Sequence, residues 1–175
     1  MTIECRGNGE PMKALVGLSV MQTDALNDAK SIDQLHSNVI QMCLLIEGVA
    51  VCSTVLGTAF QPLLIDVLYP LLEKLGSENA RVSRCALLAL SDVATSCGIA
   101  EGNIAVLLHS NADYLVNAVS LRLRCISAQP EAPSVLRVAL MYGGAAMVPL
   151  LNDVILEVSC LLCISYNSLL MSTNI

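Results

Sequence analysis

Apolar residues recur along most of this chain at the three- and four-residue spacing of helices, and no convincing strand pattern is present. A capping box at Ser31-Ile-Asp-Gln34 predicts a first helix that ends at about Leu56, with Gly57 as its stop. Pro62 marks the first turn of a second helix, which ends at Gly76. Capping residues, prolines and glycines therefore predict helix boundaries.

The middle of the chain continues this pattern. Pro70 lies inside the second helix and predicts a kink, because proline cannot donate the helical hydrogen bond. Ser77 is expected to cap a third helix that runs through Cys97 and ends at Gly98. Residues 98–110 are interpreted as an insertion that contains a short helix at 102–109.

Asn111 is expected to cap a fourth helix that ends at about Ser127. Pro130 and Pro133 end this helix and start a fifth, which stops at Gly143-Gly144. A sixth helix is expected to begin near Ala145, with Pro149 in its first turn, and to continue past Val158.

The six helices are predicted to pair as antiparallel hairpins: first with second, third with fourth, fifth with sixth. The pairs start near Ser31, Ser77 and Ala132, and the first interval matches the about 40–47 residues of HEAT and armadillo repeats. The predicted fold is all-α, an α-solenoid of HEAT/armadillo-like helix pairs, with a closed helical bundle as the alternative.

The predicted domain organisation has three parts. HEAT-like repeats occupy 31–158, as 31–76, 77–128 and 132–158. Residues 1–30 form an irregular or partial-repeat N-terminal segment with an apolar stretch at Met12–Met21. Residues 159–175 form an atypical tail without charge. Neither end supplies the polar face of a capping repeat, so we expect a piece of a longer solenoid or an abnormal C-terminus.

Composition supports helix-on-helix packing. Hydrophobic residues make up 55% of the chain and aromatic residues only 3%, so the core must be built from aliphatic side chains. The net charge of −6 argues against a nucleic-acid surface. The arginines between Arg81 and Arg137 have acidic residues among them and are interpreted as parts of solvated faces.

Seven of the eight cysteines lie in apolar helical patterns and are interpreted as free thiols that pack as small hydrophobes. They are Cys43, Cys52, Cys85, Cys97, Cys125, Cys160 and Cys163. The first residues lack the apolar stretch of a signal peptide. A reducing compartment, cytoplasmic or nuclear, is therefore expected.

A membrane protein is the less favoured alternative. Mean hydropathy is +0.67, and the stretch Val39–Phe60 is long enough to span a bilayer. However, Gln41 and Glu47 lie inside it. A second stretch, Ile155–Met171, is short, and neither is flanked by orienting basic residues. Buried helices of an assembly explain the same hydropathy.

No catalytic, cofactor-binding or metal-binding residue is predicted, and no cofactor. His36 and His109 are the only histidines and lie on different elements, and Cys160-Leu-Leu-Cys163 has no second such pair. No nucleophile elbow occurs. Glu47 stands alone in an apolar helix and is expected to reach solvent or to bond the neighbouring helix. We therefore expect a protein that is not an enzyme.

The predicted helix after Asn111 has one narrow polar strip. At about 100° per residue, its polar side chains share one arc. They are Asp113, Asn117, Ser120 and Arg124. The wide apolar arc predicts a helix covered on at least two sides. Arg122 falls among the apolar residues, so its stem is expected to pack between repeats while its guanidinium reaches an acceptor or solvent.

The segment Asn111–Arg124 resembles the one that marks the Tti-one (Tel-two-interacting protein one) family. Ser37–Gly48 is similar to the family's Gln-x-Cys-Leu-x-x-Glu-Gly helix, and Leu68–Lys74 to its Leu-Tyr-Pro-x-Leu-Glu-Lys turn. Val148–Val154 resembles the helix that follows. The resemblance covers about residues 37–158, after which the family's charged helix is not matched.

This resemblance implies a non-catalytic HEAT-repeat scaffold of the Triple T co-chaperone complex. The implied partners are the Tel-two and Tti-two subunits, the heat-shock chaperone machinery and phosphatidylinositol-3-kinase-related kinases such as mTOR, ATM and DNA-PK. The complex supports maturation and stability of these kinases, in the cytoplasm and nucleus. Family members are much longer, so the resemblance implies a fragment. The alternative from the residues alone is a generic HEAT-repeat adaptor of another class.

Overall fold

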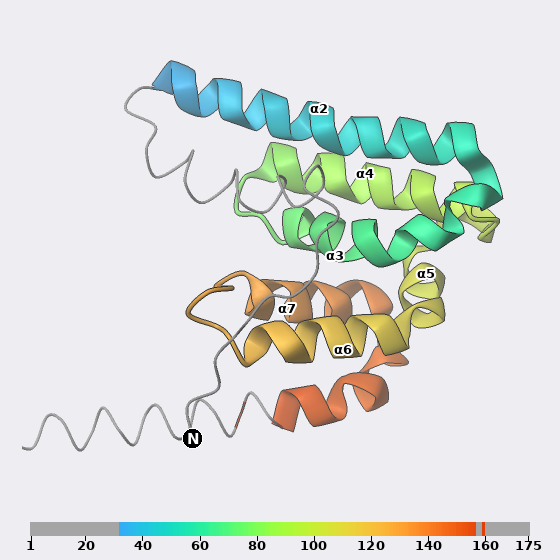
Figure 1. The fold of residues 1–175 in the computed structure, drawn as a ribbon, viewed down its shortest axis with the longest axis vertical. Coiled ribbons are helices and arrows are strands. Elements are labelled where there is room, and N and C mark those ends of the chain that lie inside the picture. The colour runs from blue at the N-terminus through green and yellow to red at the C-terminus, as the bar shows by residue number, and fades with distance from the viewer. Residues whose placement is uncertain (1–31, 157–158, 160–175) are drawn as a thin grey trace, which may run out of the picture.

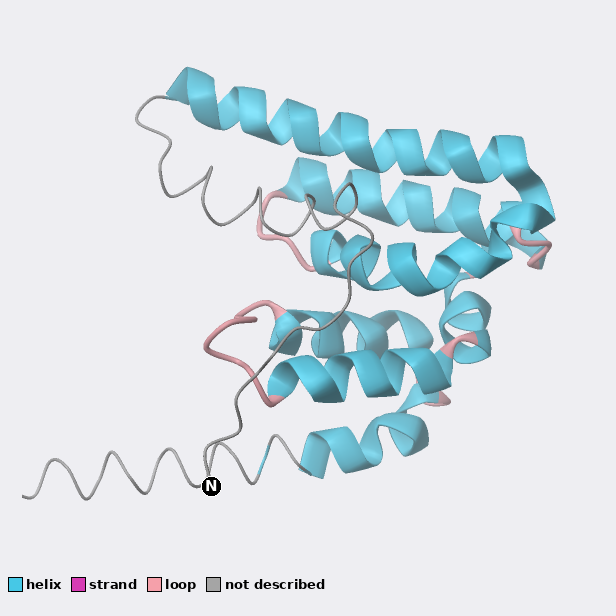
Figure 2. Cartoon of the chain, in the orientation of Figure 1, coloured by secondary structure: helices cyan, strands magenta, loops and turns pink. Residues whose placement is uncertain are grey.

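The described part of the chain is helical throughout, and its helices are joined by short loops (Figure 2). The structure is a computed structural model, and it describes residues 32–156 and residue 159. The predictions for residues 1–30 and for the tail therefore lie outside the described residues.

The first half holds a long α-helix, a 3-10 helix and two shorter α-helices. Its elements are α2 (Ile32–Leu56), the 3-10 helix η1 (Gly57–Leu63), α3 (Leu64–Leu75) and α4 (Ala80–Ser96). The second half holds η2 (Ala100–Gly102), α5 (Ile104–Ser110), α6 (Ala112–Leu123) and α7 (Ala132–Gly143). A last helix covers Met147–Leu156.

The helices form a layered stack that has α2 at one edge and the helix Met147–Leu156 at the other (Figure 1). Helix α4 packs against α2 and α3, α3 packs against α7, and α7 packs against α5 and α6. Each helix thus contacts its neighbours in the stack, as expected for a solenoid. The predicted all-α solenoid fold is confirmed.

The pairing of the helices differs from the prediction. The third predicted helix, α4, was expected to pair with the fourth, α6, but α4 packs on α2 and α3 while α6 packs on α7. The physical reason is α5, which contacts both α4 and α7 and separates α4 from α6 along the chain. The bounds of the repeats stay a prediction.

Several helix ends are as predicted. Helix α2 ends at Leu56, and Gly57 follows with a positive φ of 55°, which glycine adopts without steric cost. Gly76 ends α3, and Gly144 ends α7. Pro70 lies inside α3, and the kink expected there stays a prediction. The second predicted helix begins as η1, which contains Pro62.

The predicted cap of α4 is wrong. Asn79, rather than Ser77, precedes the helix in extended backbone, and its side-chain oxygen accepts hydrogen bonds from the N–H groups of Arg81 and Val82. The Ser77 hydroxyl instead accepts a hydrogen bond from the N–H of Asn79. Both residues are good caps, so composition alone could not choose between them.

The predicted cap of α6 is also wrong. The Asn111 side chain caps nothing in α6; its Nδ2 donates to the Leu107 carbonyl at 2.8 Å and so closes the end of α5. Helix α6 also ends at Leu123 instead of about Ser127. The next residues form turns, in which the N–H of Ala128 bonds the Cys125 carbonyl.

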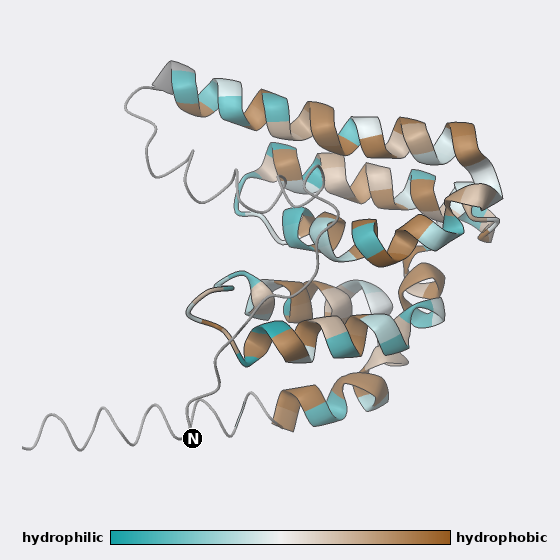
Figure 3. Ribbon diagram, in the orientation of Figure 1, coloured by the Kyte–Doolittle hydropathy of each residue, from teal (hydrophilic) through white to brown (hydrophobic). Residues whose placement is uncertain are grey.

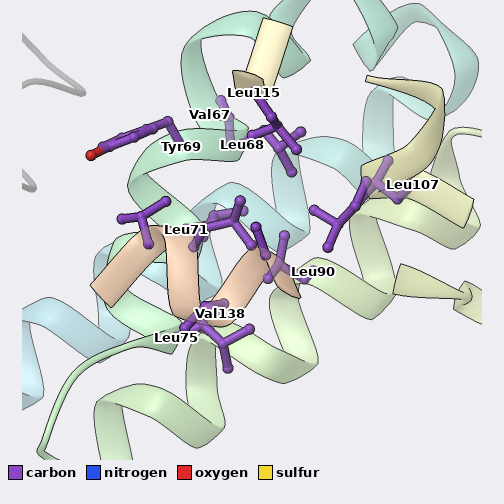
Figure 4. Close-up of a cluster of buried hydrophobic side chains, with 14 of the residues drawn as sticks. Val67, Leu68, Tyr69, Leu71, Leu75, Leu90, Leu107, Leu115 and Val138 are labelled. Carbon is purple, nitrogen blue, oxygen red and sulfur yellow. The ribbon is translucent and has the colours of Figure 1, made fainter. Parts of the chain in front are cut away.

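A single aliphatic core runs through the stack, with α3 at its centre (Figure 4). Val67, Leu68, Leu71 and Leu75 of α3 meet buried side chains from the other helices. These are Leu90 of α4, Leu107 of α5, Leu115 of α6 and Val138 of α7. Burial of each large aliphatic side chain contributes about 1.5–3 kcal/mol, so this core stabilises the whole stack.

The cysteine prediction is only partly right. Cys43, Cys52, Cys85 and Cys97 are free. Cys125 is disulfide-bonded, so the expectation of a free thiol there is wrong. Cys160 and Cys163 lie outside the described residues.

The helical run Gln34–Leu75 is long and apolar enough to cross a membrane by length and composition. One such helix is weak evidence, because the core helix of a soluble protein passes the same test. Here α2 buries one face on α4, and α3 lies at the centre of the core.

Candidate functional site

The histidines and acidic residues of the described part are spread over several helices. Within residues 32–156, no group of three or more histidine, cysteine, aspartate or glutamate side chains could hold a metal ion. His36 on α2 has its Nε2 3.5 Å from a guanidinium nitrogen of Arg81, and His109 lies at the end of α5.

Arg122 links α6 to α3. Its guanidinium lies over the ring of Tyr69, 3.9 Å from the ring centroid, and its Nη1 donates to the Ala118 carbonyl at 3.1 Å. Arg122 itself is half-buried. The prediction that the Arg122 stem is packed and that its guanidinium donates to an acceptor is confirmed. The aromatic partner was not predicted, because Tyr69 is 53 residues earlier in the sequence.

Burial around this contact favours the neutral form of the tyrosines. Desolvation raises the pKa of Tyr69 far above its ordinary range, although the Arg122 charge opposes the shift. Desolvation also raises the pKa of Tyr114, against the same charge. Both phenols therefore stay protonated at neutral pH, and the Arg122–Tyr69 contact is a cation–π interaction.

A buried ion pair lies at the end of α3, and sequence reasoning did not single it out. Lys74 Nζ is 2.9 Å from Glu73 Oε1, and both side chains are almost fully buried. Adjacent residues on a helix normally point to different sides, so their positions in the sequence do not predict an ion pair. The only signal was two charges at the end of a strongly apolar helix.

Three of the four residues of the predicted polar strip of α6 line an open groove. Asp113, Asn117 and Ser120 line it together with Val116 and with Leu150 of the last helix, whereas Arg124 does not. Much of the apolar arc is buried as predicted, at Leu115, Ala118, Val119 and Leu123. However, Leu121 and Ile126 are exposed, so the expectation that this arc is covered on at least two sides is only partly correct. No helix in the described part packs over these two residues.

The outer face of α2 carries an apolar stripe, which we define as Ile40, Leu44, Val51 and Val55. Their exposed fractions are 42%, 61%, 61% and 79%. At about 100° per residue they fall within an arc of about 60°. The opposite face of α2 is buried in the stack. Apolar residues, coloured brown, recur along α2 at the edge of the stack (Figure 3). A run of large apolar side chains along one exposed face is typical of a protein-contact surface.

A small polar cluster lies where α2 meets α4. The Cys85 thiol on α4 lies 3.5 Å from the Cys43 carbonyl oxygen and 3.8 Å from Glu47 Oε1, both on α2. The expectation that Glu47 bonds the neighbouring helix is thus confirmed. Burial, with Cys43 and Glu47 nearby, raises the pKa of Cys85 to about 12.

Comparison with known proteins identifies the family. Residues 68–159 match the family described as TELO2-interacting protein 1. The TELO2-interacting protein 1 homolog of Homo sapiens is 38% identical over 128 residues, which is 73% of this chain. The Mus musculus homolog is 37% identical over the same length. The chain belongs to the TELO2-interacting protein 1 family.

The chain spans only 12% of the length of these two relatives. No solved structure matches it. The family match contains the Arg122–Tyr69 contact, the buried Glu73–Lys74 pair and the groove on α6. The stripe on α2 lies before the matched residues. The family resemblance first drawn from residues 37–158 is therefore confirmed.

Proposed function

We propose that this chain is a non-catalytic helical scaffold that works through protein–protein contacts in a complex with a TELO2 homolog. The observation that carries the proposal is membership of a family whose curated relatives are named for interaction with TELO2. Three of the polar contacts support it, because they join one helix to another: Arg122 with Tyr69, Cys85 with Glu47, and Ser134 with Gly76.

More specifically, we propose a role in the Triple T co-chaperone complex. The chain contributes there to a complex with Tel-two and Tti-two homologs and the heat-shock chaperone machinery. The complex supports maturation and stability of phosphatidylinositol-3-kinase-related kinases in the cytoplasm and nucleus. An open stack of helices suits this role, because it offers extended surface without needing an enclosed site.

We assign the TELO2 contact to the stripe on α2. Its four side chains are large, apolar and exposed along one face of α2. Burial of such side chains contributes about 25 cal/mol per Å² of apolar surface removed from water. The partner surface must accordingly be apolar and elongated, like the face of another helix.

Co-purification tests this function. The tagged full chain is expressed in cells and recovered under native conditions, and TELO2 and the related kinases are measured in the eluate. We expect TELO2 to co-purify, and the kinases with it. An eluate without TELO2 overturns the proposal. An eluate with TELO2 but without the kinases overturns only the Triple T co-chaperone role.

A membrane protein is the second candidate, because the run Gln34–Leu75 has the length and hydropathy of a spanning helix. Extraction of cell membranes with alkaline carbonate separates the two functions. Release of the chain into the supernatant excludes a spanning helix, and retention in the pellet would favour it over the scaffold.

A further inference from the structure

Two free cysteines face each other where α2 packs on α4. The Cys85 thiol lies 3.5 Å from the carbonyl oxygen of Cys43, and the two side chains are close enough to hydrogen bond. Both residues are partly exposed, so small solutes can reach them. The other two free cysteines among the described residues differ: Cys52 is exposed on α2, and Cys97 is buried at the end of α4.

The packing around this pair allows the close backbone approach that a disulfide needs. A disulfide usually requires Cα atoms about 4.4–6.8 Å apart, which is closer than the about 8–10 Å between the axes of most packed helices. The Cys85 sulfur reaches the main-chain carbonyl oxygen of Cys43, so the two backbones approach closely at this point. Ala86, the residue after Cys85, is buried in the interface and is too small to hold the helices apart.

We propose that Cys43 and Cys85 form an oxidisable pair that peroxide converts to a disulfide, locking α2 to α4. This modification site is independent of the proposed binding function. Intracellular disulfides of this kind are typically transient and redox-sensing. Its consequence is mechanical: the helix that carries the stripe becomes covalently fixed to the stack.

The chemistry balances with hydrogen peroxide as the oxidant. The Cys43 sulfur, as thiolate, attacks one peroxide oxygen; the O–O bond breaks and leaves Cys43 sulfenic acid and hydroxide, which takes up the thiol proton as water. The Cys85 sulfur then attacks the Cys43 sulfur, the S–O bond breaks, and a second water leaves. Two thiols and one peroxide give one disulfide and two waters.

Glu47 gives this second step a proton acceptor. Its Oε1 lies 3.8 Å from the Cys85 sulfur and is placed to take the thiol proton as the sulfur attacks. Cys85 is the resolving thiol rather than the first to react, because burial and the neighbouring Cys43 and Glu47 keep its pKa near 12. Glu47 acts here as a positioning residue and base for Cys85.

The test uses the full chain with Cys52→Ser and Cys97→Ala, which leaves Cys43 and Cys85 as the free described cysteines. The folded protein is treated with peroxide, capped with N-ethylmaleimide and digested with trypsin. Cleavage at Lys74 and Arg84 puts the two cysteines on different peptides. We expect one mass for the Cys43–Cys85 linked peptides, lost on reduction with dithiothreitol.

Two further variants separate the role of Cys85 from that of Glu47. With Cys85→Ser, the linked mass should vanish and sulfenic acid at Cys43, trapped with dimedone, should rise several-fold. With Glu47→Gln, the link should form several-fold more slowly while circular dichroism stays unchanged. Full maleimide labelling of both cysteines after peroxide, in protein that keeps its helical circular dichroism, would overturn the proposal.

Discussion

Arg122 holds its guanidinium 3.9 Å from the ring centroid of Tyr69 and so joins α6 to α3 across the middle of the stack. The two residues come from different layers, and both lie within the residues that match the family. The contact explains how a charged side chain is accommodated among apolar neighbours, because the ring face and the Ala118 carbonyl together replace water.

A double-mutant cycle measures this contact. Arg122→Ala, Tyr69→Leu and the double variant are compared with the parent by urea unfolding. We expect a coupling free energy of about 0.5–2 kcal/mol, because the contact is partly shielded from water. Strictly additive single effects would show that the ring and the guanidinium do not interact.

The core around α3 predicts a second stability difference. Leu90→Ala should lower the free energy of unfolding by about 2–5 kcal/mol, because Leu90 is fully buried on α4. Leu88→Ala on the same helix is the matched control, since Leu88 is 61% exposed, and should change it by no more than about 0.5 kcal/mol. Equal effects of the two changes would contradict the assigned orientation of α4.

Gly102 and Gly144 both have left-handed backbone, but only Gly102 is closely surrounded by other atoms, so alanine substitutions there should differ in their effect on stability. Both have a positive φ, 61° and 66°. A Cβ on Gly102 would lie 2.8 Å from the Ser91 carbonyl oxygen, whereas one on Gly144 would meet nothing within 4 Å. Gly102→Ala should therefore lower the melting temperature more than Gly144→Ala. The reverse order would argue against the packing of η2 on α4.

The raised pKa of Cys85 predicts a loss of stability at alkaline pH. The pKa is about 12 in the fold against an ordinary value of 9.0, so the unfolded chain gives up this proton first. The contribution of the Cys85 thiol to the free energy of unfolding is complete below pH 9.0 and is lost as pH rises toward 12. The groups that face the thiol are Cys43 and Glu47 of α2. The difference in urea midpoint between the parent and Cys85→Ala should shrink over this range, and a constant difference would refute the assignment.

The sequence predicted helix ends best where only one residue type easily adopts the backbone conformation that is needed. Gly57 and Gly144 ended helices as predicted, because positive φ is easily adopted only by glycine. The sequence was least informative where two residues could serve equally. Ser77 and Asn79 are both good caps, and Asn111 closes the helix before it instead of capping the one after.

Contacts between distant residues could not be predicted from one sequence. The approach of Cys85 to Cys43 joins residues 42 positions apart, and the partner of Arg122 lies on another helix. One sequence also could not show which face of α2 packs on α4. The pairing of helices failed for the same reason, since α5 changed which neighbours α4 could reach.

Binding of purified TELO2 to the stripe tests the central claim most directly. The affinity of the full chain is compared with those of Leu44→Glu on α2 and Leu121→Glu on α6, whose side chains are exposed to 61% and 62%. A buried unpaired carboxylate costs several kcal/mol, so Leu44→Glu should weaken binding by at least about tenfold, and Leu121→Glu should bind like the parent. If the parent does not bind TELO2, or Leu44→Glu binds as tightly, the account is contradicted.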